Sequence, residues 1–174
     1  MKKLIVFAVA ILGFSAVSFG QATATASSTA VLLTPISIQK TTDLNFGSIA
    51  ASATAGTVDL DYADGRTSTA SVKLLAGTAT QKTAVFTVTG EAAQTFSITT
   101  NDVAAVLPMT GGSAGVGVTG ITCQEGTAST IGGTAGGGSN TKVLHVKAQL
   151  IIPANAVAGT YSNTNGLTVT VNYN

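Results

Sequence analysis

The stretch from Lys142 to Ile152 reads Lys-Val-Leu-His-Val-Lys-Ala-Gln-Leu-Ile-Ile, and it decides the fold class. One parity holds Leu144, Val146, Ala148, Leu150 and Ile152, and the other holds Val143, His145, Lys147 and Gln149. Because successive side chains of a strand point to opposite faces, the first set is expected to face a core. The stretch therefore predicts a long β-strand that ends before Pro153.

Shorter stretches with the same period lie on both sides of this one. Apolar residues alternate with polar ones in Val58 to Tyr62, in Val116 to Cys123 and in Leu167 to Tyr173. No stretch of ten or more residues has a convincing helical period. The pattern predicts an all-β protein, an immunoglobulin-like (Greek-key) β-sandwich of about nine or ten short, mainly antiparallel strands. The glycine-rich stretch 124–140 is expected to be a surface loop.

The start of the chain has the pattern of a cleaved signal peptide. Two lysines precede the uncharged run Leu4–Phe19, and a small-x-small cleavage pattern ends at Gly20. The run is shorter than the roughly 20 residues that a membrane-spanning helix needs. We therefore expect a signal peptide over 1–20 and a single β-sandwich domain over 21–174, with no membrane span in the mature chain. Such a chain would be secreted to the periplasm or the cell surface.

Charge and composition exclude several classes of protein. Without the two lysines of the signal peptide the chain has six basic and seven acidic residues, so nothing attracts nucleic acid. A mean hydropathy of +0.44 is too high for a disordered chain, and an aromatic content of 5% argues against the aromatic girdles of a transmembrane barrel. The single cysteine, Cys123, cannot form an internal disulfide and is expected to be a small buried apolar residue.

The residues suited to catalysis are few. His145 is the only histidine, and it lies on the polar parity of its predicted strand. The glycines of Gly115 to Gly120 match the G-x-G-x-x-G pattern, but the residues that follow do not start a helix, as a dinucleotide site requires. There is no convergent set of acid, base and nucleophile, so we expect a protein that is not an enzyme and has no cofactor.

A weak calcium site is the one metal hypothesis. Asp59, Asp61 and Asp64 lie within six residues, next to Gly65. A calcium loop of the EF-hand type would have a bidentate glutamate at position twelve, where this chain has Ala70. A strand with alternating carboxylates followed by an Asp-Gly turn explains the same residues without a metal ion.

Five blocks of the sequence are similar to one known family. They are Pro35–Ile49, Asp64–Thr67, Ala84–Gly90 running into Gln94–Ile98, Ile152–Tyr161, and Leu167–Tyr173. Together they resemble a family of exported Gram-negative bacterial domains of unknown function, of the DUF 4402 type. The resemblance covers nearly all of the expected mature chain.

The last block also resembles the end of spore-coat-U-like and chaperone–usher pilin subunits. In those relatives the fold is an incomplete immunoglobulin-like sandwich, which a neighbour's N-terminal extension completes by adding a strand. The resemblance implies a structural or adhesive surface protein, pilin-like or fimbrial, whose partners are other copies or a periplasmic chaperone. The assembly residues that it implies are Leu167, Val169, Val171 and Tyr173.

Two departures from the pilin pattern leave an alternative open. The best-known pilins pair two cysteines, and donor strands carry large apolar residues where this chain has Ala22, Ala24 and Ala26. The N-terminal segment could equally be the domain's own first strand. The alternative function is a self-contained extracellular binding module for a glycan or protein ligand, although the chain has no tryptophan to stack on a sugar ring.

Overall fold

The structure, a computed structural model, describes residues 20–50, 52–69, 71–77, 79–101, 107–108, 110, 115–133, 139–164 and 166–174. The predicted signal peptide over 1–20 lies outside the described residues, apart from Gly20. The next residues, up to Leu32, are exposed and form no strand. A compact unit extends from Leu33 to Asn174 and contains every strand described. No described helix is long and apolar enough to cross a membrane.

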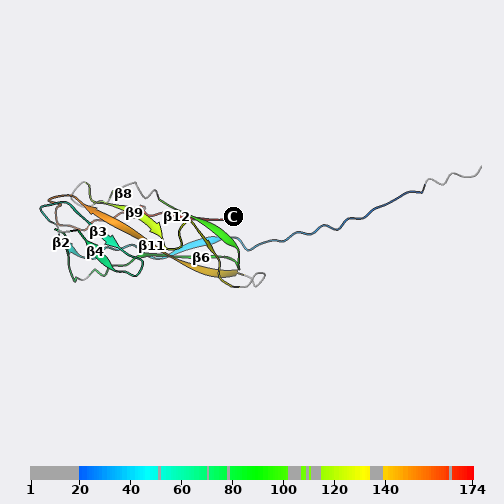
Figure 1. Cartoon of the computed structure of the whole chain (residues 1–174), viewed down its shortest axis with the longest axis horizontal. Coiled ribbons are helices and arrows are strands. Elements are labelled where there is room, and N and C mark those ends of the chain that lie inside the picture. The colour runs from blue at the N-terminus through cyan, green and yellow to red at the C-terminus, as the bar shows by residue number, and fades with distance from the viewer. Residues whose placement is uncertain are drawn as a thin grey trace, which may run out of the picture. The chain divides into compact units, whose positions relative to one another are not determined.

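The described residues form twelve strands and no helix, which confirms the predicted all-β class (Figure 1). The strands are β1 (Ser37–Thr42), β2 (Ile49–Ala50), β3 (Gly56–Leu60), β4 (Arg66–Ser68), β5 (Lys73–Leu74), β6 (Ala84–Glu91), β7 (Thr95–Thr100), β8 (Leu107–Pro108), β9 (Gly117–Cys123), β10 (Ala128–Thr130), β11 (Ser139–Ile152) and β12 (Val169–Tyr173). All their pairings are antiparallel. Strands of two or three residues account for the excess over the predicted number.

The strands make two main sheets and one small one. The large sheet has the order β1-β6-β11-β3-β4, with β9 paired to β11 and β8 paired to β9. The second sheet has the order β10-β7-β12, and β2 pairs with β5 alone. Residues of β11 pair with β6 and then β3 along one edge and with β9 along the other, which makes β11 the hub of the large sheet (Figure 1).

The core lies between the sheets, as expected for a β-sandwich. In β11 the five residues of the predicted core parity are all buried, while Val143 on the other parity is exposed. Phe96 and Ile98 of β7 and Val169 and Val171 of β12 meet this set from the second sheet. Each such side chain contributes about 1.5–3 kcal/mol when it is fully buried. In both sheets, therefore, the alternate apolar side chains face the shared core and hold the two layers together.

The prediction of a surface loop over 124–140 is wrong in part. Ala128–Thr130 forms β10, which pairs with β7, and β11 already starts at Ser139. Ile131 is fully buried, and its N–H and C=O pair with Gln94 and Ala93. Local composition favours a loop here, but pairing with the edge of β7 and burial of one isoleucine override it.

Candidate assembly site

The second sheet ends at β12, one edge of which is unpaired. β12 pairs with β7 from Val169 to Tyr173, and no other strand in the described part of the chain pairs with it. The side chains of Val169 and Val171 are buried in the core, while Thr170 and Asn172 are exposed. The strand predicted to start at Leu167 therefore starts two residues later, and Leu167 is partly buried just before it.

The unpaired edge of β12 presents main-chain groups of the same residues that contact the core. The N–H of Asn174 donates to the C=O of Thr95 (3.3 Å), so Asn174, Asn172 and Thr170 are the residues that face β7. The N–H and C=O groups of Val169, Val171 and Tyr173 then point away from β7. A strand added at this edge would bond to these groups and place its own alternate side chains over the core.

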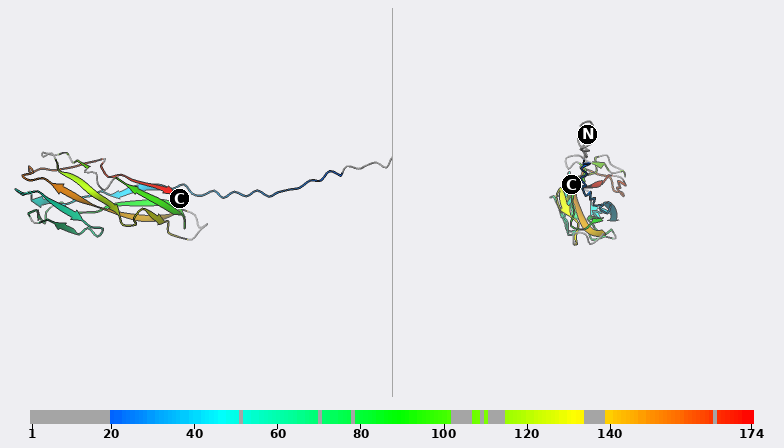
Figure 2. Two further views of the ribbon diagram at one scale, coloured as in Figure 1. Left: turned by 45° about the horizontal axis from the view of Figure 1, so that its top comes forward. Right: turned by 90° about the vertical axis from the view of Figure 1, so that its right-hand side faces the viewer.

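The first strand of the large sheet, β1, lies beside β12 (Figure 2). Among the described strands, β1 pairs only with β6. We call the unpaired edges of β1 and β12 the open edges. Ile36 and Ile38 lie on or just before β1 and pack against the core while remaining partly exposed. The sandwich is therefore unpaired where its two sheets come together at β1 and β12.

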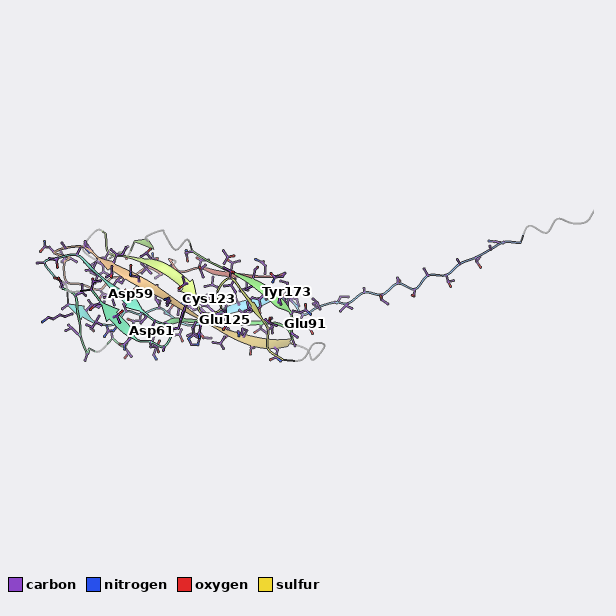
Figure 3. All side chains as sticks on the ribbon, viewed as in Figure 1. Asp59, Asp61, Glu91, Cys123, Glu125 and Tyr173 are labelled. Atoms are coloured by element: carbon purple, nitrogen blue, oxygen red, sulfur yellow. The ribbon has the colours of Figure 1, made fainter. Side chains whose placement is uncertain are left out.

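A hydrogen-bond network ties the two sheets at one end of the open edges. The Tyr173 hydroxyl donates to the C=O of Thr34 (2.7 Å) and accepts from the N–H of Glu91 (2.6 Å). The Glu91 carboxylate, buried beside it, accepts from the Thr34 hydroxyl (2.8 Å). Figure 3 shows Glu91 and Tyr173 next to each other. Because this network joins the start of β1 to the end of β12, the two strands run in opposite directions.

Glycine at position 90 leaves room for this network. A Cβ atom there would collide with the Tyr173 hydroxyl and with Ile131. This explains why the block Ala84–Gly90 ends in glycine, which the sequence alone did not explain.

The described segment before the domain has no strand assigned to it. The first strand is β1, which starts at Ser37, and the described residues from Gly20 to Leu32 form no strand. Val31 and Leu32 are 86% and 89% exposed.

The three aspartates of the calcium hypothesis have separate structural partners. Asp61 accepts from the N–H groups of Ala63 (2.8 Å) and Gly65 (2.7 Å), which closes the predicted turn. Asp59 accepts from the Gln149 side-chain amide (2.8 Å). In the described ranges no three His, Cys, Asp or Glu side chains gather closely enough to hold a metal ion.

Asp64 connects this turn to the chain before β6. Its carboxylate accepts from Lys82 (2.7 Å) and from the N–H (2.7 Å) and hydroxyl (3.0 Å) of Thr83. The Lys82 hydrogen bond, followed by that from the Thr83 N–H, lowers the pKa of Asp64. Asp64 also has a positive φ of 66°, which aspartate tolerates better than most residues.

Arg66 has a structural role that sequence reasoning missed. Its guanidinium donates to the carbonyls of Phe46 (2.7 Å), Ser48 (3.1 Å) and Leu75 (3.1 Å). It thereby holds together the loops that flank β2 and β5. The signal was its place in the Asp64–Thr67 block as the only arginine of the chain. Arg66 and Asp64 of this block thus both anchor neighbouring loops.

Cys123 and His145 do not form a catalytic pair. Cys123 is buried, as predicted, and burial raises the pKa of its thiol. It pairs with Val146, which faces the core, so His145 lies on the opposite face of the sheet. The His145 Nδ1 atom is buried without a hydrogen-bond partner among the described residues.

The fold and the open edges define a β-sandwich domain with an edge strand at its C-terminus. The family described as "Domain of unknown function (DUF4402)" matches residues 36–173, and the chain belongs to this family. No curated protein matches the chain, and no solved structure matches it.

Proposed function

We propose that this protein is an exported, non-enzymatic surface protein, a pilin-like structural or adhesive subunit that assembles by strand complementation. The observation that carries the proposal is the open edge of β12, where Val169 and Val171 turn their main-chain groups away from β7 and also have buried side chains. The resemblance of this strand to the end of spore-coat-U-like and pilin subunits supports the same role. The signal-peptide pattern supports a location in the periplasm or on the cell surface.

The sequence of β12 does little to discourage an added strand. Native proteins commonly protect an edge strand with a charged side chain, a proline or a bulge. β1 has such features, since Lys40 lies in it and its register shifts between Lys40 and Thr42. β12 reads Val-Thr-Val-Asn-Tyr and has no charge, proline or bulge. Of the two open edges, β12 is therefore the better acceptor for a strand.

The N-terminal segment of a second copy is the donor that we favour. Residues 22–26 alternate alanine and threonine, and the apolar residues Val31, Leu32 and Leu33 follow. The segment is exposed and forms no strand up to Leu32. Alternate small side chains can lie over a core edge without steric conflict, and the larger ones can bury apolar area. Repeated head-to-tail pairing of this kind forms a filament, whereas a chaperone would hold a single subunit.

Electrophoresis of unboiled mature protein in SDS tests the proposal. We expect a ladder of resistant multimers that boiling removes. Deletion of Gln21–Ala30 should abolish the ladder and leave a folded monomer, because the acceptor edge remains but the donor loses its alternating part and is too short to pair along β12. A matched control with the same segment replaced by a scrambled order of its residues keeps the length and composition.

One outcome of this experiment would contradict the proposal of strand complementation. A strictly monomeric mature protein, with a cooperative thermal transition that is unchanged by the deletion, would exclude assembly through this segment. The self-contained binding module would then be the better description of the domain.

A further inference from the structure

The outer face of the large sheet has a polar hollow well away from the open edges. Its volume is about 390 Å³, within the range of roughly 300–1,000 Å³ of small-molecule sites. Figure 3 shows Asp59 and Asp61, which line it, toward the end of the domain that is remote from Glu91 and Tyr173. The other polar side chains that line it belong to Thr67, Lys147 and Gln149.

Two glycines help to form the hollow. Gly120 lies where the register of β9 against β11 shifts between Lys147 and Gln149, and its φ of +60° suits such a bulge. Gly65 lies at the opposite side, where a Cβ atom would collide with the Asp61 carboxylate. The hollow is therefore a product of backbone geometry that larger residues would change.

The charged groups around the hollow are held in place by neighbours. Asp59 is bonded to Gln149, and Asp61 is fixed by the N–H groups of its own turn. The Lys147 ammonium lies 5.2 Å from the centre of the Tyr62 ring. The Tyr62 hydroxyl is bonded in turn to the Thr122 hydroxyl (3.1 Å). Such preorganisation lowers the entropy cost of binding a ligand.

The chemistry of the lining selects the class of ligand. Two carboxylates and one ammonium line the hollow, so its formal charge is negative and an anionic ligand is disfavoured. In both carboxylates Oδ1 has a partner, and no described group of the protein donates to Oδ2. Lys147 and Thr67 supply donors beside these acceptors. This array of adjacent donors and acceptors suits the vicinal hydroxyls of a sugar.

We propose that this hollow binds one neutral hexose residue of a glycan. Asp59 and Gln149 would form hydrogen bonds with two neighbouring hydroxyls of the sugar. Lys147 would donate a hydrogen bond to a third oxygen of the sugar. The site does not involve the open edges, so it could serve an assembled subunit or a monomer equally. It would give the proposed surface protein an adhesive activity.

Amide chemical shifts of the labelled mature protein test this proposal. Glucose, galactose and mannose are each titrated to high millimolar concentration, since galactose and mannose each differ from glucose in the orientation of one hydroxyl. We expect at least one of them to give saturable shifts at Asp59, Lys147 and Gln149. Asp59→Ala and Gln149→Ala should each weaken that binding at least roughly tenfold, because each removes hydrogen bonds that involve a charged or paired group.

Asp43→Ala is the matched control, because Asp43 is also an exposed carboxylate and is paired with Lys40 outside the hollow. It should bind the sugar with unchanged affinity. The proposal is overturned if none of the three sugars gives a saturable shift, if the shifts lie elsewhere, or if Asp59→Ala and Asp43→Ala bind equally well. None of these results bears on the ladder experiment, so the two proposals can fail separately.

Discussion

β11 and β12 have the same kind of sequence but differ in their surroundings. Both alternate buried apolar residues with polar ones, and both contribute to one core. β11 is paired along both edges, whereas β12 is paired along one. The comparison teaches that side-chain burial and main-chain pairing are separate properties of a strand. A strand can bury its apolar side chains in the core and still have main-chain groups available to a partner strand.

The largest expected difference between the two strands is in amide hydrogen exchange. The Val171 amide of monomeric protein should exchange at least about a hundredfold faster than the Val146 amide, because it faces the open edge. In assembled protein the two should become similar. Equal protection of both amides in the monomer would mean that β12 already has a partner strand, and the comparison would fail.

The same valine truncation in each strand compares their packing. Val146 is 0% exposed and Val171 is 8% exposed. We expect Val146→Ala to lower the free energy of unfolding by about 2–3 kcal/mol and Val171→Ala by about 1–2 kcal/mol, since an edge can relax around a cavity. Urea unfolding of the monomer measures both values. A larger effect at Val171 would show that the edge is as rigid as the centre of the sheet.

Tyr173→Phe tests the network that anchors β12. The change leaves the Thr34 carbonyl and the Glu91 N–H without their hydroxyl partner, so we expect a loss of about 1–3 kcal/mol in the free energy of unfolding. Tyr161→Phe is the control, since the Tyr161 hydroxyl donates to Val157 at an exposed site. Its effect should be smaller. If both changes lowered the free energy of unfolding equally, the network would not be what anchors β12.

Acid unfolding of Asp64→Asn probes the loop between β3 and β4, on the β11 side of the comparison. Because Lys82 and Thr83 lower the pKa of Asp64 in the folded state, its contribution to stability is present above the unfolded-state pKa and is lost as the pH falls through the folded-state pKa. Asparagine tolerates the same positive φ. The variant should therefore be slightly less stable at neutral pH and lose less stability on acidification below about pH 4.

An unchanged acid profile would contradict that expectation. Asp43→Asn is the comparison variant, because Asp43 pairs with Lys40 at an exposed site. This is the smallest effect of the four, and urea unfolding at several pH values measures it.

Much of the fold could be predicted from the sequence because its strands are two-sided. The alternation of Lys142–Ile152 predicted which residues of β11 face the core, and the same pattern located β9 and most of β12. β10 was missed because only Ile131 marks it in a stretch of glycine, threonine and alanine. Its pairing with β7 depends on residues more than thirty positions away.

The candidate sites show the same division. The assembly residues from Leu167 to Tyr173 could be named in advance, since the resemblance and the alternation coincide there. The hollow could not, because Asp59, Lys147 and Gly120 become neighbours only through the pairing of three strands. Asp61 and Asp64, although only three positions apart in the sequence, have different partners because a turn with positive φ separates their side chains.

The amino-acid sequence alone determined that this protein is all-β, which residues of each long strand face inward, and that a single cysteine is buried. These properties depend on a period of two, which neighbouring residues express without reference to the rest of the chain. Only the tertiary structure decided that β11 is paired on both edges and β12 on one, and that β3, β4, β9 and β11 together line a hollow. Such properties depend on register and strand order, which are set by contacts between residues far apart in the chain.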